Sequence, residues 1–131
     1  MATEFIVKLR DRPGELATLT GALGDAGVNM RAVGGSGAGG NANVGIVVSD
    51  KDTAKARRAL KRAGYRVRTE RKAIEVRLAD RPGALARVAA RFGKNKVNIS
   101  SAYILGPGRG KVTVAFGVKD ARAAGRALGR R

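Results

Sequence analysis

The sequence predicts an α+β fold in which one small unit is used twice. The segment Asp11-Arg12-Pro13-Gly14 returns 69 residues later as Asp80-Arg81-Pro82-Gly83, and the apolar pattern around it returns too. In both copies, stretches of strand periodicity alternate with stretches of helical periodicity. A unit used only twice indicates paired small domains rather than a solenoid. We therefore expect one domain at residues 1–70 and a second at residues 71–131.

The first copy begins with a strand and a helix. Residues 5–10 alternate apolar and polar side chains, which predicts a strand with one face toward a core. Residues 14–26 carry leucines at helical spacing, so they predict an amphipathic helix that Gly27 ends. Residues 28–33 and 44–48 then predict the two strands of a hairpin.

Glycines dominate the segment between those two strands. Residues 34–40 satisfy the spacing G-x-G-x-x-G, but a β-branched run follows them, whereas a dinucleotide fingerprint opens a helix. We expect a flexible hairpin tip. A basic helix at residues 52–63 and a strand at residues 65–69 complete the order β-α-β-β-α-β. This order predicts a ferredoxin-like sandwich with helices on one face of an antiparallel sheet.

The second copy follows the same order but lacks its last strand. Residues 74–78 predict its first strand, residues 85–92 its first helix, and residues 97–105 and 112–118 a hairpin across Gly106-Pro107-Gly108. A short helix at residues 121–128 ends the pattern. The second unit is therefore expected to be truncated after its second helix.

The truncation leaves the Ile74 strand with an open edge, which proteins normally cover. One hypothesis is that a turn at residues 70–73 folds Tyr65–Thr69 back onto this strand, pairing Thr69 with Ile74. That pairing would give one seven-stranded sheet with all four helices on one side. The alternative joins the second-strand edges of the two units, or of two chains.

The composition argues against catalysis. The chain has no histidine and no cysteine, so the commonest general base, the usual zinc ligands and the thiolate nucleophile are missing. We expect no enzyme activity, no metal and no cofactor. An acylphosphatase-like hydrolase is disfavoured because Asp11 and Pro13 occupy the turn where its phosphate loop would lie. No apolar run is long enough for a bilayer, and no secretory signal is evident, so we expect a cytoplasmic protein without membrane contact.

The net charge of +17 makes nucleic acid a candidate partner. Basic residues are spread along the whole chain, which an arginine-biased proteome would also explain. Five aromatic residues are present, and the phenylalanines Phe5, Phe92 and Phe116 fall on core positions. The open face of the sheet instead offers basic side chains at Lys8, Arg10, Arg66, Arg68 and Arg77. Any nucleic-acid binding should thus be weak, non-specific and salt-dependent, without base stacking.

The repeated turn predicts a site for a small zwitterion. Gly14 and Gly83 carry no Cβ, so a ligand could approach the backbone closely. The first amides of a helix lack intrahelical partners and favour a carboxylate. Asp11 and Asp80 could hold an ammonium group, although capping of the helix explains them equally well. The amides of Asn29 and Asn98 could add hydrogen bonds, or serve a local turn.

These motifs resemble the ACT domain family of small regulatory modules. The resemblance rests on Asp11–Leu16 with Val28-Asn29-Met30, and on Asp80–Leu85 with Val97-Asn98-Ile99. It implies binding of a free amino acid where each helix start meets the second strand of a neighbouring unit. The residues that it implies as ligand-binding are Asp11, Pro13, Gly14, Glu15, Leu16, Asn29, Met30, Asp80, Pro82, Gly83, Ala84, Leu85, Asn98 and Ile99.

The resulting hypothesis is a non-catalytic regulatory protein that forms a homodimer and senses a small amino acid. Binding would change the oligomeric state, or modulate a regulated enzyme or regulator protein. Two alternatives stay open at this stage. One is a basic nucleic-acid-associated protein of the same fold, and the other is a purely structural dimerisation module.

Overall fold

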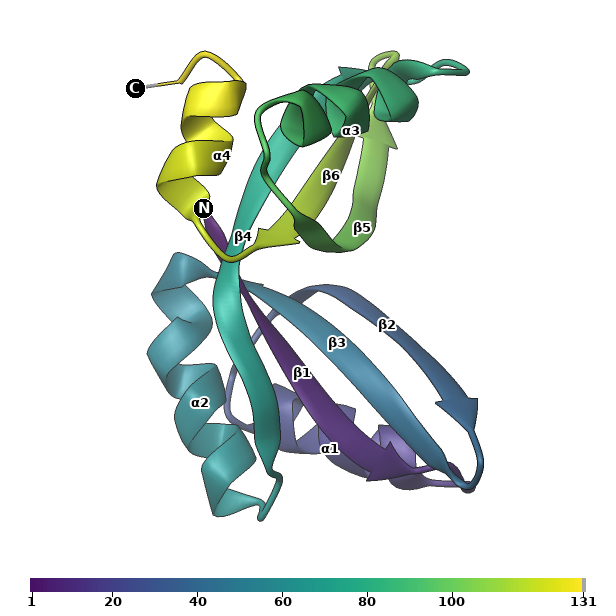
Figure 1. Ribbon diagram of the computed structural model, residues 1–131. Helices are drawn as coiled ribbons and strands as arrows, with labels where there is room; N and C mark the ends of the chain where they lie inside the picture. Colours follow the sequence, from purple (N-terminus) through teal and green to yellow (C-terminus); the bar gives the residue numbers. More distant parts are fainter. Residues whose placement is uncertain (131) are drawn as a thin grey trace. The chain divides into compact units, whose positions relative to one another are not determined.

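The computed structural model describes residues 1–130, and Arg131, the last residue of the expected second domain, lies outside them. The chain divides into two compact units (Figure 1). The first unit is Ala2–Glu70, and the second contains Met1 and the chain from Arg71 onward. Each unit is described by itself below.

The first unit has the complete ferredoxin-like order, and the predicted fold class is confirmed. Its strands lie in the order β2-β3-β1-β4, and β3 pairs antiparallel with both β1 and β2. The helices α1 and α2 cover one face of these strands (Figure 1). Its elements are β1 (Ala2–Arg10), α1 (Glu15–Asp25), β2 (Met30–Ala38), β3 (Asn41–Ser49), a short 3₁₀ helix (Asp50–Asp52), α2 (Thr53–Arg62) and the start of β4 (Val67–Ala79).

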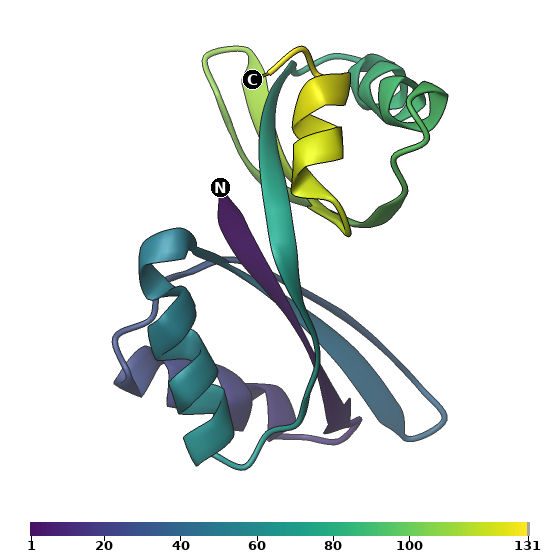
Figure 2. The same ribbon diagram turned by 60° about the vertical axis from the view of Figure 1, so that its left-hand side comes forward.

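The second unit repeats this plan without a final strand. The remainder of β4 begins it, and its strands lie in the order β4-β6-β5. The helices α3 and α4 pack on one face of them (Figure 2). No strand follows α4 within residues 1–130, as the sequence predicts. The further elements are α3 (Ala84–Lys94), β5 (Ile99–Gly108), β6 (Lys111–Val118) and α4 (Ala121–Ala127).

The hypothesis of a turn at residues 70–73 is wrong. Strand β4 runs without interruption from Val67 to Ala79, so Thr69 and Ile74 lie on one strand and do not pair. The described chain therefore has six strands rather than seven. The physical reason lies in the segment Glu70-Arg71-Lys72-Ala73, which contains no glycine, proline, asparagine or aspartate to turn the chain.

Each unit has its own hydrophobic core on the side that the helices cover. In the first unit, Phe5 packs with Leu19, Ile46 and Leu60, all completely buried. In the second, the rings of Phe92 and Phe116 meet edge to face, with centroids 5.2 Å apart at 69°. The core positions predicted for the three phenylalanines are confirmed.

Both hairpins are longer than the sequence predicts. The glycine-rich segment from Gly34 to Ala38 is not a flexible tip but part of β2, paired with β3. The turn itself is Gly39-Gly40, with φ of 62° and 83°, and its counterpart is Arg109-Gly110. A Cβ at Gly35 would lie only 3.0 Å from the Asn43 carbonyl oxygen, so a larger residue would require the strands to shift slightly. These glycines therefore permit close strand packing.

Two glycines of the α1 region should respond to alanine with opposite signs. Gly14 precedes α1 with φ of 87°, so we expect Gly14→Ala to lower the free energy of unfolding by roughly 1–2 kcal/mol. Gly21 lies inside α1 with open space around it, so Gly21→Ala should raise it by roughly 0.5–1 kcal/mol. Urea unfolding followed by circular dichroism measures both. Equal effects of the two substitutions would contradict the left-handed conformation of Gly14.

Candidate functional site

The turn between the first strand and the first helix is built identically in the two units. The Asp11 N–H donates to the Gly40 carbonyl at 3.0 Å, and the Asp80 N–H donates to the Gly110 carbonyl at 2.9 Å. Gly14 and Gly83 adopt the left-handed conformation, with φ of 87° and 85°. These bonds hold each turn against the tip of its own hairpin.

The start of each helix has no side-chain cap. Among the described residues, no side chain accepts a hydrogen bond from the first amides of α1 or α3, so the interpretation of Asp11 and Asp80 as caps is wrong. The Asp120 side chain, by contrast, does cap α4, accepting from the Ala123 N–H at 3.0 Å. The Glu15 and Ala84 N–H groups donate to the carbonyls of Arg12 and Arg81 at 3.4 and 3.3 Å. Among the described residues, the next two amides of each helix, residues 16–17 and 85–86, are left for another acceptor.

In the first unit, the turn borders a hollow of about 300 Å³ between the start of α1 and strand β2. Antiparallel pairing places Val33, Gly35 and Gly37 on the face of the sheet that the helices cover. The absence of side chains at the two glycines leaves the space open. The lining residues are Leu9, Arg10, Asp11, Arg12, Glu15, Leu16, Val33, Gly34, Gly35, Ser36, Gly37, Ala42 and Val44.

The Asp11 carboxylate lies directly over Gly37. A Cβ added to Gly37 would overlap the carboxylate oxygens, so the contact requires glycine or a different position of the aspartate. Among the described residues, no side chain forms an ion pair or hydrogen bond with this carboxylate. The neighbouring Glu15 carboxylate is instead held by Arg12, whose Nε lies 2.9 Å from Oε1. Asp11 therefore offers an unpaired negative charge at the edge of the hollow.

Apolar side chains form the rim of the same hollow. Leu16 is 51% exposed and Val33 is 42% exposed, although both are large and apolar. The hollow therefore combines an unpaired carboxylate, uncapped helix amides, the cations Arg10 and Arg12, and an apolar rim. A small molecule with both charges and a short apolar group fits this combination.

The second unit does not reproduce the residues that line this hollow. The strand registers align Gly35 with Ile104 and Gly37 with Pro107, because each pair faces an equivalent residue of the central hairpin strand. Ala84, which is buried, replaces Glu15. The turn is thus repeated in the second unit, but the two glycines of β2 beside it are not. The motif Asp-Arg-Pro-Gly is identical in both copies, so the sequence motif alone predicts two equivalent sites.

The predicted asparagines lie away from the turn in their own unit. Met30 pairs with Val48 near the first residues of β1, whereas Asp11 follows the last residue of β1. The Asn29 N–H donates to Asp52 Oδ2 at 3.3 Å, and Asn98 Nδ2 contacts Ser100 Oγ at 3.4 Å. Asn29, Met30, Asn98 and Ile99 therefore do not join the turn of the same unit.

The residues that sequence reasoning missed are Val33–Gly37 of β2, together with Arg10 and Arg12. The run of glycines in β2 is the sequence signal for these positions, and read by itself it predicts a loop. Residues 1–130 contain no cluster of three histidine, cysteine, aspartate or glutamate side chains that could hold a metal ion. No helix in that part of the chain is both long and apolar enough to span a membrane.

The model of the ACT domain family matches residues 3–64 and again residues 72–128. The chain belongs to the ACT domain family, with two copies of the domain in tandem. The ACT domain is a regulatory module, not a catalytic one, and typically binds amino acids. A comparison with curated proteins finds no match to this chain.

Solved structures share the fold over nearly the whole chain. The protein BT0572 from Bacteroides thetaiotaomicron has a TM-score of 0.79 at 23% identity, covering 97% of this chain and 85% of its own. The ligand-free regulatory subunit of aspartate kinase from Thermus thermophilus has a TM-score of 0.72 at 20% identity, covering 98% and 89%. At such identities the likeness concerns the fold alone.

Proposed function

We propose that this protein is an amino-acid sensor whose principal site is the hollow beside Asp11 in the first unit. The observation that carries the proposal is the unpaired Asp11 carboxylate seated over Gly37, next to uncapped helix amides. A free amino acid presents an ammonium and a carboxylate on one carbon. The Asp11 carboxylate would hold the ammonium, and the amides of Leu16 and Ala17 in α1 would donate to the carboxylate.

The size and lining of the hollow favour a small amino acid. A hollow of about 300 Å³ lies at the lower end of the range for ligand pockets. The rim formed by Leu16 and Val33 suits a short aliphatic side chain rather than a charged one. The proposed ligand class is therefore a small amino acid with an apolar or short polar side chain.

The second unit would serve a different role. Its turn has the same backbone geometry, but Ile104 and Pro107 stand at the positions that correspond to Gly35 and Gly37. Asp80, Pro82, Gly83, Ala84 and Leu85 thus form at most a weaker site. Asn29, Met30, Asn98 and Ile99 would reach a ligand only from a neighbouring copy, such as the second chain of a homodimer.

Regulation would follow from a difference in affinity between two arrangements of the protein. An amino acid that binds one arrangement better shifts the population toward it, and the shift cannot exceed that difference. The edge strands β2 and β5 are available for pairing with a second copy or a partner protein. We propose that the ligand changes this pairing and so controls a partner enzyme or regulator.

The test is a thermal-shift screen against the twenty amino acids at millimolar concentration. We expect one or a few small amino acids to raise the melting temperature, since a ligand that binds only the folded state stabilises it. Asp11→Asn should abolish the shift, whereas the matched variant Asp80→Asn should retain it. No shift with any amino acid would contradict the proposal and leave a structural module. Sedimentation of the wild-type protein with and without the active ligand then measures the change in oligomeric state.

A further inference from the structure

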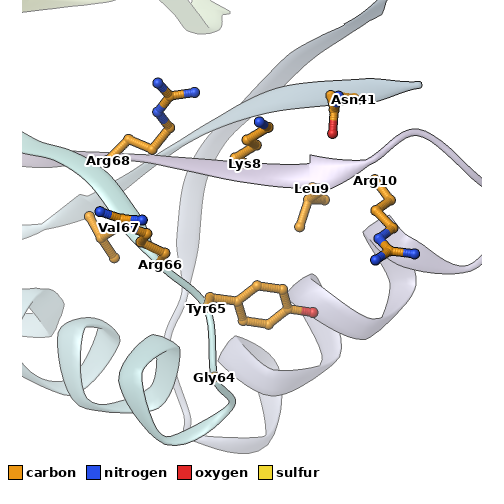
Figure 3. Close-up of a pocket in the computed structure, with 9 residues that line it drawn as sticks. All are labelled: Lys8, Leu9, Arg10, Asn41, Gly64, Tyr65, Arg66, Val67 and Arg68. Atoms are coloured by element: carbon orange, nitrogen blue, oxygen red, sulfur yellow. The ribbon is translucent and has the colours of Figure 1, made fainter. Parts of the chain in front are cut away.

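A second hollow lies on the first unit, between the end of β1 and the start of β4 (Figure 3). Its volume is about 670 Å³, within the range of small-molecule sites. Four of its lining side chains are cationic, and a phenol and an amide accompany them. These six residues are Lys8, Arg10, Arg66, Arg68, Tyr65 and Asn41.

The alternation of the strands explains why the cations gather there. Lys8 and Arg10 are exposed, while Val7 and Leu9 between and beside them are buried in the core. Arg66 and Arg68 are exposed on either side of Val67, which packs against the same core. Figure 3 shows the ends of Lys8 and Arg68 on one side of β1, and Arg10 toward the start of α1. The pattern that buries the core therefore brings four positive charges to one hollow.

No carboxylate lines this hollow. Among the described residues, Lys8, Arg10, Arg66 and Arg68 form no ion pair, whereas Arg12 and Arg57 are paired with Glu15 and Glu70. Four like charges around one hollow repel each other, and a bound anion relieves the repulsion.

Tyr65 also lines the hollow, and Figure 3 shows its phenol directed toward α1. Burial, and secondarily the charge of Glu15, raises the pKa of the Tyr65 phenol above its ordinary value of 10.0. The phenol is therefore protonated at neutral pH and can donate a hydrogen bond to an anion. It is also the one aromatic side chain in the lining.

We propose that this hollow binds a small ligand carrying two or more adjacent phosphate groups. Three guanidinium groups match phosphate oxygens in paired hydrogen bonds, and four positive charges suit a polyphosphate better than a single carboxylate. A single-stranded nucleic acid fits less well, since it stacks successive bases on several aromatic faces. The site is separate from the amino-acid site, although Leu9 and Arg10 border both.

The experiment is calorimetric titration of the full-length protein with inorganic tripolyphosphate at constant ionic strength. The double variant Arg66→Gln/Arg68→Gln should weaken the affinity at least tenfold, because two guanidinium partners are lost. Both arginines are exposed, and neither borders the amino-acid site. The control Arg58→Gln/Lys61→Gln removes the same charge from exposed positions of α2 and should change the affinity less than twofold.

Three results would overturn the proposal. The first is absence of saturable tripolyphosphate binding to the wild-type protein. The second is an equal loss in the test and control variants, which would assign binding to the overall charge of +17. The third is binding of short oligouridylate, dependent on Arg66 and Arg68, in the absence of tripolyphosphate binding, which would identify a nucleic-acid surface.

Discussion

Gly37→Ala is expected to weaken amino-acid binding at least tenfold while leaving the fold intact. The added methyl group would overlap the Asp11 carboxylate, which must then rotate away from the hollow. The aspartate is the flexible partner, and Gly37 does not adopt a left-handed conformation, so the cost to stability should be within about 0.5 kcal/mol. The affinity should fall by a factor of ten or more, as expected when a charged partner of a ligand is lost. Titration calorimetry with the amino acid found in the thermal-shift screen measures the affinity.

A matched control is available in the second unit. Gly108 lies in the corresponding hairpin, and a Cβ there would meet nothing within 4 Å. Gly108→Ala should therefore leave binding unchanged. Wild-type affinity in Gly37→Ala would show that the position of Asp11 over Gly37 does not matter for the ligand. A loss in both variants would point to a general effect on the hairpins.

Phe92→Ala should produce the largest loss of stability among single substitutions in the second unit. The Phe92 side chain is completely buried and packs edge to face on Phe116. Removing the ring leaves a cavity and loses the aromatic contact, for an expected cost of about 3–5 kcal/mol in the free energy of unfolding. Urea unfolding followed by circular dichroism measures the change.

Leu85→Ala serves as the control for that experiment. Leu85 lies on the same helix, but 43% of it is exposed, so its truncation should cost well under 1 kcal/mol. Comparable costs for the two variants would mean that Phe92 does not anchor the core of the second unit. The two variants compare the loss of a buried side chain with the loss of an exposed one on the same helix.

The alternation of apolar residues predicted the element order and the core. Phe5, Val7 and Leu9 mark a one-sided strand, and the spacing of Leu19 and Leu23 marks the buried face of a helix. These are local patterns, and the local preference agrees with the tertiary environment in both units. The fold class and its truncation after α4 could therefore be predicted.

The sequence pattern gives the wrong structure for two segments, the glycine-rich part of β2 and the segment after Thr69. The glycines of Gly34–Ala38 indicated a loop, but backbone pairing with β3 keeps them in a strand. The hypothesis of a turn after Thr69 relied on the need to cover a strand edge, and the segment lacks turn-forming residues. In both segments, pairing with a neighbouring strand keeps the backbone extended.

The candidate site could be predicted only in part. The turn from Asp11 to Leu16 is visible as a motif. The contact of Asp11 with Gly37 depends on the register of two hairpin strands and the path of the turn, which no local pattern encodes. The same register distinguishes the two copies, because it places Pro107 where the first copy has Gly37.

The stoichiometry of amino-acid binding tests the central claim most directly. Calorimetric titration of the wild-type protein with the active amino acid should give one ligand per chain. The reason is that Gly35 and Gly37 lie beside the turn of the first unit, whereas Ile104 and Pro107 stand at the corresponding positions of the second. That single site should be lost in Asp11→Asn. Two equivalent sites per chain, or one site that survives in Asp11→Asn, would contradict the account.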